Sequence, residues 1–137
     1  MRLSSLLDLK IVNINCSSGI GLITALNCLL SEYRKIEQEL QQLDIALEPE
    51  ICEGFPGFNQ LDLMAMICQR NLFGCDPSAE NIEIAKLGLW LRTAQSDRPL
   101  LPLDNNIKLG DLSSRNLSSK FTEFFGRDIT AECLLII

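Results

Sequence analysis

The sequence contains no histidine and no closely spaced pair of cysteines, and these two absences exclude several kinds of site. No C-x-x-C pair occurs among its six cysteines, which are Cys16, Cys28, Cys52, Cys68, Cys75 and Cys133. Structural zinc is held by cysteines and histidines at short, regular spacings, so we expect no metal site. A dithiol redox protein also needs paired cysteines, which argues against that function. The cysteines that lie in apolar runs are typical of reduced, buried thiols.

Basic runs and long apolar runs are missing as well. The 137 residues carry 12 Lys and Arg against 18 Asp and Glu, which gives a net charge of −6. Nucleic-acid binding requires positive charge to neutralise phosphates, so this chain alone is not expected to hold DNA or RNA tightly. No uncharged stretch reaches the ~20 residues that span a bilayer, and Asp8 and Lys10 interrupt the first apolar run. We therefore expect a cytoplasmic protein that makes no membrane contact.

Strand and helix patterns alternate along the chain, which favours one α/β domain over 1–137. Two prolines and two glycines in 48–58 separate the first long helix from the elements that follow. We expect strands at 9–15, 71–76 and 107–109, helices at 22–43, 60–69 and 79–94, and a further strand from the apolar run 134–137. This order predicts a parallel sheet with right-handed crossovers and flanking helices.

The clearest helix pattern covers 22–43. Its apolar residues alternate in steps of four and three, namely Leu22, Leu26, Leu29, Tyr33, Ile36, Leu40 and Leu43. Such spacing places them on one face, with charged and amide side chains opposite. This face can pack on a sheet, and it can equally form a seam with another helix.

The segment 71–76, Asn-Leu-Phe-Gly-Cys-Asp, predicts a buried strand that ends in the carboxylate of Asp76. Pro77 follows outside the next helix, and Ser78 is the expected N-cap. Ligands of α/β sheets bind at the carboxyl ends of strands, where a carboxylate can accept hydrogen bonds from two ribose hydroxyls. An Asp in a turn before a helix is also common for structural reasons alone.

Three stretches, in this order, resemble motifs of the S-adenosylmethionine-binding domain of N6-adenine DNA methyltransferases. The closest likeness is to the large restriction–modification enzymes whose catalytic loop reads Asn-Pro-Pro-Tyr. The stretch 12–19, Val-Asn-Ile-Asn-Cys-Ser-Ser-Gly, is similar to their first motif, approximately Leu-Asp-Pro-Ala-Cys-Gly-Ser-Gly. The stretch 72–76 and its helix resemble the second motif, Tyr-Gly-Val-Asp. The stretch 103–108 with Gly110 and Asp111 resembles the third.

The resemblance implies a partial Rossmann-like sheet of the class I methyltransferase type that binds S-adenosylmethionine weakly. The residues it assigns to the cofactor are Asn13, Cys16, Gly19, Asp76, Pro77 and Asp111. Asp76 takes the place of the ribose-binding carboxylate, and Pro77 that of the apolar residue beside the adenine. Asp111 corresponds to the group that accepts from the adenine amino group. Asn13 stands where the family has an acid, so the charge that attracts the cofactor's ammonium is absent.

Structural interpretations of the same residues stay open. The segment after the first strand can be a simple turn in which Ser17 or Ser18 caps the next helix. Asp111 can be a solvent-exposed turn residue after Gly110. Trp90, on the helix at 79–94, is expected in the core.

The family's catalytic Asn-Pro-Pro-Tyr loop is absent. In the family this loop follows the fourth strand, binds the amino group of the target adenine and stacks on the flipped base. Residues 121–126 resemble the approach to that strand, but the sequence then diverges. We therefore predict a single, incomplete methyltransferase-like domain without catalytic residues, which reaches DNA only through regions outside this chain or a partner chain.

Two functions are compatible with these patterns. The first is the cofactor-binding half of a site-specific adenine-N6 DNA methyltransferase, inactive alone. The alternative is a non-catalytic protein–protein interaction module that uses the helix at 22–43. Expected partners are a second copy or a complementing methyltransferase fragment, since an apolar edge strand at 134–137 would also attract a neighbour.

Overall fold

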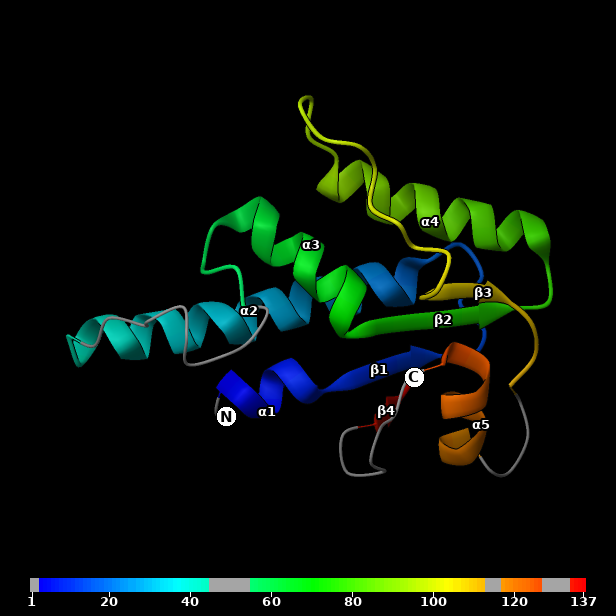
Figure 1. Ribbon diagram of the computed structural model, residues 1–137, viewed down its shortest axis with the longest axis horizontal. Coiled ribbons are helices and arrows are strands. Elements are labelled where there is room, and N and C mark those ends of the chain that lie inside the picture. The colour runs from blue at the N-terminus through cyan, green and yellow to red at the C-terminus, as the bar shows by residue number, and fades with distance from the viewer. Residues whose placement is uncertain (1–2, 45–54, 113–116, 127–133) are drawn as a thin grey trace.

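The structure is a computed structural model that describes residues 3–44, 55–112, 117–126 and 134–137 (Figure 1). Its elements, in chain order, are α1 (Leu3–Asp8), β1 (Lys10–Asn13), α2 (Ile20–Gln42), α3 (Gln60–Arg70), β2 (Leu72–Asp76), α4 (Ala79–Thr93), β3 (Ile107–Leu109), α5 (Leu117–Phe125) and β4 (Leu134–Ile136). Each predicted strand is a strand in the structure and each predicted helix is a helix, with small differences in their bounds. The helices α1 and α5 were not predicted. Of the helix-breaking region 48–58, the part up to 54 lies outside the described residues, and 55–58 is not helical.

The four strands form one all-parallel sheet in the order β3-β2-β1-β4. Ile11 pairs with Leu72 across β1 and β2, and Lys10 pairs with Leu134 across β1 and β4. The predicted α/β class with a parallel sheet and flanking helices is therefore confirmed. This order is also that of the first strands of a doubly wound, Rossmann-like sheet, with which the fold is compatible. In such a sheet the order reverses between β1 and β4.

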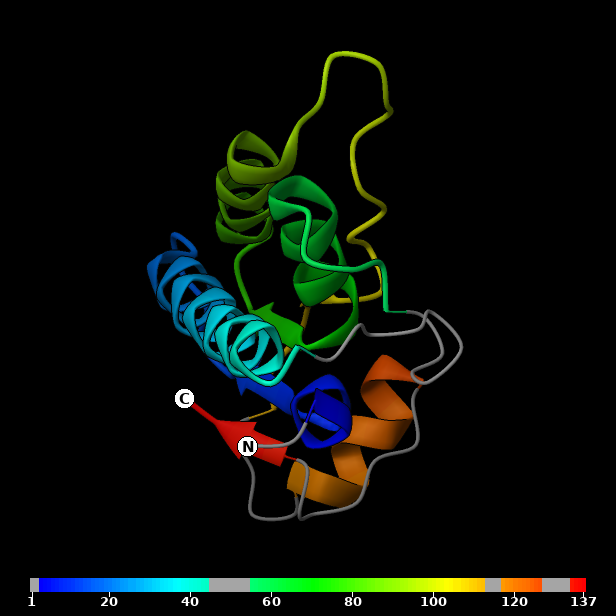
Figure 2. The same ribbon diagram turned by 90° about the vertical axis from the view of Figure 1, so that its left-hand side faces the viewer.

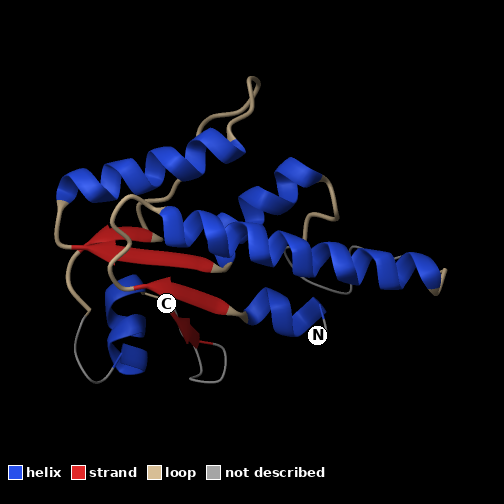
Figure 3. Cartoon of the chain, turned by 180° about the vertical axis from the view of Figure 1, so that it is seen from behind, coloured by secondary structure: helices blue, strands red, loops and turns tan. Residues whose placement is uncertain are grey.

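Helices cover both faces of this sheet (Figures 1 and 2). Helices α2, α3 and α4 lie on one face, and α5 lies on the other. Figure 3 shows the same layers from behind. Side chains alternate along each strand, so Ile11 and Leu72 enter the larger core while Val12 and Phe73 enter the smaller one. The smaller core is aromatic, with the ring of Phe73 centred 5.0 Å from that of Phe121.

The apolar face of α2 is buried in the chain's own core. Leu22, Leu26, Leu29 and Tyr33 are each at most 3% exposed, as the four-three spacing predicts. Toward the end of the helix the burial fades, and Leu43 is 68% exposed. The seam proposed for a partner helix is therefore largely occupied by the sheet and by α3, which leaves little of it for another protein.

Helix α4 packs inward through one side only, which carries Ile82, Ala85 and Leu89. Leu87 and Leu91 are 52% and 77% exposed, because α4 is the outermost helix on its face of the sheet (Figure 2). Trp90 is only partly buried at the rim of the core, where its indole nitrogen donates to the carbonyl of Leu101 at 2.9 Å.

Two buried asparagines hold the amino-terminal ends of the strands. Asn71, the C-cap of α3, donates from its amide to the carbonyls of Leu6 and Leu9. Asn106, just before β3, donates to the carbonyls of Gln69 and Leu72. These bonds satisfy backbone groups that would otherwise be buried without partners.

Among the described helices, none combines the length and apolar character needed to cross a membrane.

Candidate functional site

The loops that carry the predicted site residues meet at the carboxyl edge of the sheet. The amide of Cys16, in the loop after β1, donates to the carbonyl of Cys75 in β2 at 3.0 Å. The amide of Gly110, after β3, donates to the carbonyl of Asp76 at 3.0 Å. Burial raises the pKa of the Cys75 thiol, a hydrogen bond with the Leu112 backbone lowers it, and the charges of Asp111 and Asp76 raise it. The structure therefore brings the three motif-like segments together.

Asp76 is the centre of this arrangement. Its Oδ1 accepts hydrogen bonds from the amide of Ser78 at 2.9 Å and from the side chain of Asn81 at 3.1 Å. Its Oδ2 accepts from the amide of Ser17 at 3.1 Å. The residue is only 2% exposed, so these loops cover it. The Ser78 amide, followed by Asn81 and Ser17, lowers the pKa of the Asp76 carboxyl against the opposing effect of desolvation.

The turn after Asp76 starts helix α4 as the sequence predicts. Ser78 is the N-cap, and its Oγ accepts from the amide of Asn81 at 3.4 Å. Ser78 also donates from its hydroxyl to the Glu80 carboxylate at 3.0 Å. Pro77 lies exposed between Asp76 and this cap, next to the carboxyl edge. An exposed apolar ring at this point is compatible with the predicted place beside an adenine.

The loop between β1 and α2 has left-handed backbone at two positions. Ser17 has φ 47° and Gly19 has φ 87°. A Cβ on Gly19 would lie 2.9 Å from Cα of Ala85 in α4, so only glycine fits there. Ser17 holds a conformation that favours glycine, at the position where the resembling family has one.

The predicted capping of α2 by Ser17 or Ser18 is wrong. The N-cap is Gly19, and no side chain accepts a hydrogen bond there. Both serines are exposed. The cause is the close approach of Gly19 to α4, which requires a left-handed glycine where a serine cap would otherwise sit.

Asn13 ends β1, which is shorter than the predicted strand 9–15. Its Oδ1 accepts from the amide of Asn15 at 3.3 Å, and the chain turns there instead of extending. The amide nitrogen of Asn13 faces the first turn of α2, where a Cβ at Gly21 would require the Asn13 side chain to move. Sequence reasoning missed this contact, for which the glycine two residues after Gly19 was the available signal.

Cys16 belongs to the packing beneath the loop. It is 2% exposed, and its side chain lies against Gly74, where an added Cβ would be 3.2 Å from that of Cys16. Burial, followed by the charge of Asp76, raises the pKa of its thiol to about 11. The thiol is therefore neutral near pH 7 and is a poor nucleophile. The Cys16 backbone is also engaged, because its amide donates to the carbonyl of Cys75 and its carbonyl accepts from the amide of Gly19, so Cys16 supports the loop by packing.

These groups favour binding over acid–base catalysis. A carboxylate that accepts three hydrogen bonds and has a lowered pKa is a weak proton acceptor near neutral pH. The amides of Cys16, Ser17 and Gly19 are already bonded within the chain. Other polar groups in these loops include the Asn13 side chain and the Asp111 carboxylate. Such groups can recognise the hydroxyl, amino and ammonium groups of a nucleoside-like ligand.

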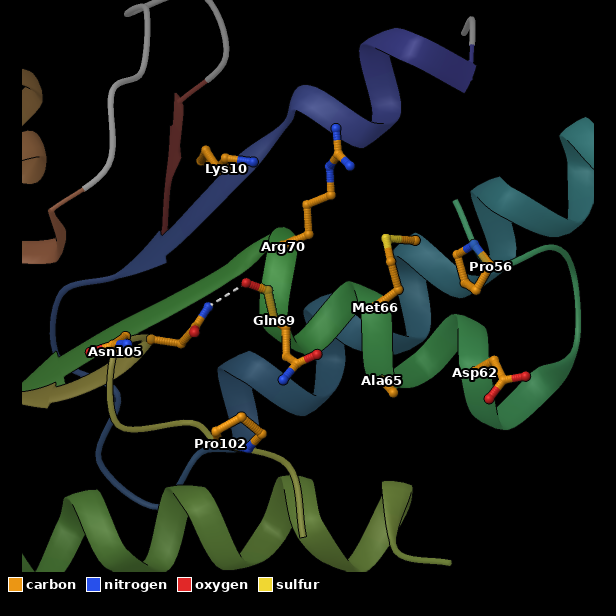
Figure 4. A pocket seen from close by; sticks show the side chains of 10 residues that line it. Lys10, Pro56, Asp62, Ala65, Met66, Gln69, Arg70, Pro102 and Asn105 are labelled. Carbon is orange, nitrogen blue, oxygen red and sulfur yellow. Dashed lines mark hydrogen bonds between the residues drawn. The ribbon is translucent and has the colours of Figure 1, made fainter. Parts of the chain in front are cut away.

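A second cavity, of about 900 Å³, lies at the opposite edge of the sheet (Figure 4). It is bordered by the start of β1, the length of α3 and the loop before β3. Lys10, Arg70 and Asn105 supply polar groups, and Met66 and Pro102 supply apolar ones. Arg70 is already engaged, because its Nε donates to the carbonyl of Leu7 at 2.9 Å. None of the predicted site residues lines this cavity.

Comparisons of the chain with protein-family models, with curated proteins and with solved structures found no match. The interpretation of the site therefore depends on its own geometry: three loops joined at the carboxyl edge of a parallel sheet, around one buried carboxylate.

Proposed function

We propose that the chain is a non-catalytic module that binds S-adenosylmethionine weakly, as the cofactor half of an adenine-N6 DNA methyltransferase-like protein of class I type. The observation that carries this proposal is the position of Asp76. It ends β2 at the carboxyl edge and is hydrogen-bonded to the loops that follow β1 and β3. In sheets of this strand order, that edge binds nucleotide cofactors, and an acidic residue after the second strand contacts the ribose.

Weak binding is expected for two reasons. Asn13 offers an amide where a carboxylate would attract the ligand's ammonium, and charge-assisted hydrogen bonds are about twice as strong as neutral ones. Asp76 also accepts three hydrogen bonds from the chain itself, which leaves little acceptor capacity for a ligand. DNA would be reached only through other regions or a partner chain, because the net charge is −6.

Isothermal titration with S-adenosylmethionine and S-adenosylhomocysteine tests the proposal. We expect dissociation constants in the high micromolar to millimolar range, and loss of binding in Asp76→Ala. Asp62→Ala is the matched control, because Asp62 pairs with Arg98 away from the site. Absent binding, or binding unchanged by Asp76→Ala, would refute the proposal.

A gain of function gives a sharper test. Asn13→Asp restores a negative charge at the end of β1 and should tighten binding of both ligands several-fold, since each carries the same ammonium. No labelled methyl should reach DNA from the chain alone, with or without this substitution. Methyl transfer by the chain would show that the missing Asn-Pro-Pro-Tyr loop is not required.

A second candidate is an interaction module, favoured by the outer side of α4. Ile84, Leu87 and Leu91 are exposed there at steps of three and four, 49%, 52% and 77% respectively. An apolar stripe of this spacing fits another helix, including α4 of a second copy. Sedimentation would then show a dimer that Leu87→Glu dissociates. A monomer at all concentrations would exclude self-association.

A further inference from the structure

The hydrogen bonds already made by Asp76 limit what else it can bind. A carboxylate has about four acceptor positions, two on each oxygen. Both positions on Oδ1 are taken, one by the Ser78 amide and one by the Asn81 side chain. On Oδ2 the Ser17 amide takes one. Counting donors from the described residues alone, a single position on Oδ2 is left.

We propose that Asn81 is a positioning residue that restricts Asp76 to one hydrogen bond from the ribose of an adenosine-containing ligand. The inference rests on the proposed function, and it specifies how that site recognises its ligand. A ribose presents two adjacent hydroxyls, and a carboxylate with both oxygens open can accept from each. Here Oδ1 is closed by Asn81, so only one hydroxyl contributes.

The burial of Asp76 supports the same conclusion. With 2% of the residue exposed, little of the carboxylate is open to a ligand while the Ser17 amide stays bonded to Oδ2, which favours contact with one hydroxyl over two. Asn81 is itself fixed, because its backbone amide is bonded to the N-cap Ser78 in the first turn of α4. The side chain that closes Oδ1 therefore belongs to a rigid element.

Titration calorimetry with S-adenosylhomocysteine and with its 2′-deoxy and 3′-deoxy analogues tests the inference. In the unsubstituted chain, one analogue should bind about tenfold more weakly than the parent, the effect of one hydrogen bond to a charged group. The other analogue should bind within about twofold. In Asn81→Ala, Oδ1 is open and both analogues should bind more weakly than the parent. Asn81→Leu removes the donor but leaves a larger apolar group over Oδ1, so it should keep the pattern of the unsubstituted chain.

Asn27→Ala is the control. Asn27 lies in α2, and its side-chain amide accepts a hydrogen bond from Arg92 of α4. The substitution therefore also removes an amide that contacts α4, but it leaves the bonds of Asp76 in place. It should keep the pattern of the unsubstituted chain. Equal weakening by both analogues in the unsubstituted chain, or an unchanged pattern in Asn81→Ala, would overturn the inference and leave the proposed function standing. Absence of any S-adenosylhomocysteine binding would overturn both.

A second measurement needs no ligand. NMR titration of the Asp76 carboxyl carbon should show a higher pKa in Asn81→Ala and Asn81→Leu than in the unsubstituted chain, because a donor to the charged form is lost. An unchanged pKa would mean that Asn81 does not hold this carboxylate.

Discussion

The Tyr33 hydroxyl donates a hydrogen bond to Oδ1 of Asn71 across 3.3 Å, and neither residue is exposed to solvent. Asn71 thereby connects the middle of α2 to the start of β2, while its amide holds the carbonyls of Leu6 and Leu9. Burial raises the pKa of Tyr33, so the phenol remains a neutral donor. One side chain at this point satisfies polar groups from two other stretches of the chain, residues 6–9 and Tyr33.

Asn71→Ala should lower the free energy of unfolding by about 3 kcal/mol, because it leaves a buried hydroxyl and two carbonyls without this partner. Urea unfolding followed by circular dichroism measures the loss. Tyr33→Phe removes one bond and keeps the ring, so it should cost only about 1 kcal/mol. Equal losses in the two variants would contradict the central role of the Asn71 amide.

Gly19→Ala and Gly57→Ala form a matched pair. Both glycines have left-handed backbone, with φ of 87° and 90°. A Cβ at Gly57 meets nothing within 4 Å, whereas one at Gly19 meets the backbone of Ala85. We expect Gly57→Ala to destabilise by about 1 kcal/mol through strain alone, and Gly19→Ala by at least twice as much, about 2 kcal/mol or more. Similar unfolding midpoints would mean that the loop moves away from α4 easily.

The Asp76 carboxyl should make stability depend on pH. Its pKa is lowered in the folded chain, first by the Ser78 amide, so its contribution is complete above the unfolded pKa and is lost as pH falls through the folded pKa. The difference in unfolding free energy between the unsubstituted chain and Asp76→Asn should therefore be constant above about pH 5 and shrink below about pH 4. Urea titrations at several pH values measure this. A difference that grows in acid would contradict it.

The thiols should differ in reactivity. Burial raises the pKa of Cys68 to about 12 and that of Cys16 to about 11, whereas Cys28 is exposed on α2. Iodoacetamide near pH 8 should therefore label Cys28 before Cys16 and Cys68, which should stay unmodified until the chain unfolds. Mass spectrometry of the peptides reports each rate. Early labelling of Cys16 would show that the loop above it opens readily.

Periodicity was a sufficient guide to the larger elements. The four-three spacing over 22–43 predicted α2, and the β-branched and apolar runs predicted β1, β2 and β3, because these patterns arise directly from burial on one face. The helices α1 and α5 were missed. Each is short, and α5 is held by packing of Phe121 and Phe125 on Phe73, a contact between distant parts of the chain that local pattern does not reveal.

The site was predictable in its position and not in its bonding. Asp76 at the end of a strand predicts a place at the carboxyl edge from local sequence alone. The sequence did not predict that the Asp76 carboxylate accepts hydrogen bonds from Ser17 and Asn81. The bond with Ser17 joins residues that are distant in sequence, and local patterns do not reveal such contacts. The same reason explains the wrong serine cap, since the approach of Gly19 to Ala85 depends on how α4 packs on α2.

The parallel pairing of Lys10 with Leu134 has a consequence for the order in which the fold forms. These partners lie about 120 residues apart, so pairing β4 with β1 requires closing a long loop, which costs conformational entropy. Helices α2, α3 and α4 can assemble around β1 and β2 through contacts of shorter sequence separation, and we expect them to do so earlier. We therefore expect a slow final phase in refolding, in which a preformed three-stranded intermediate takes up β4. Until then one side of β1, at the centre of the finished sheet, is an open edge that can pair with other chains.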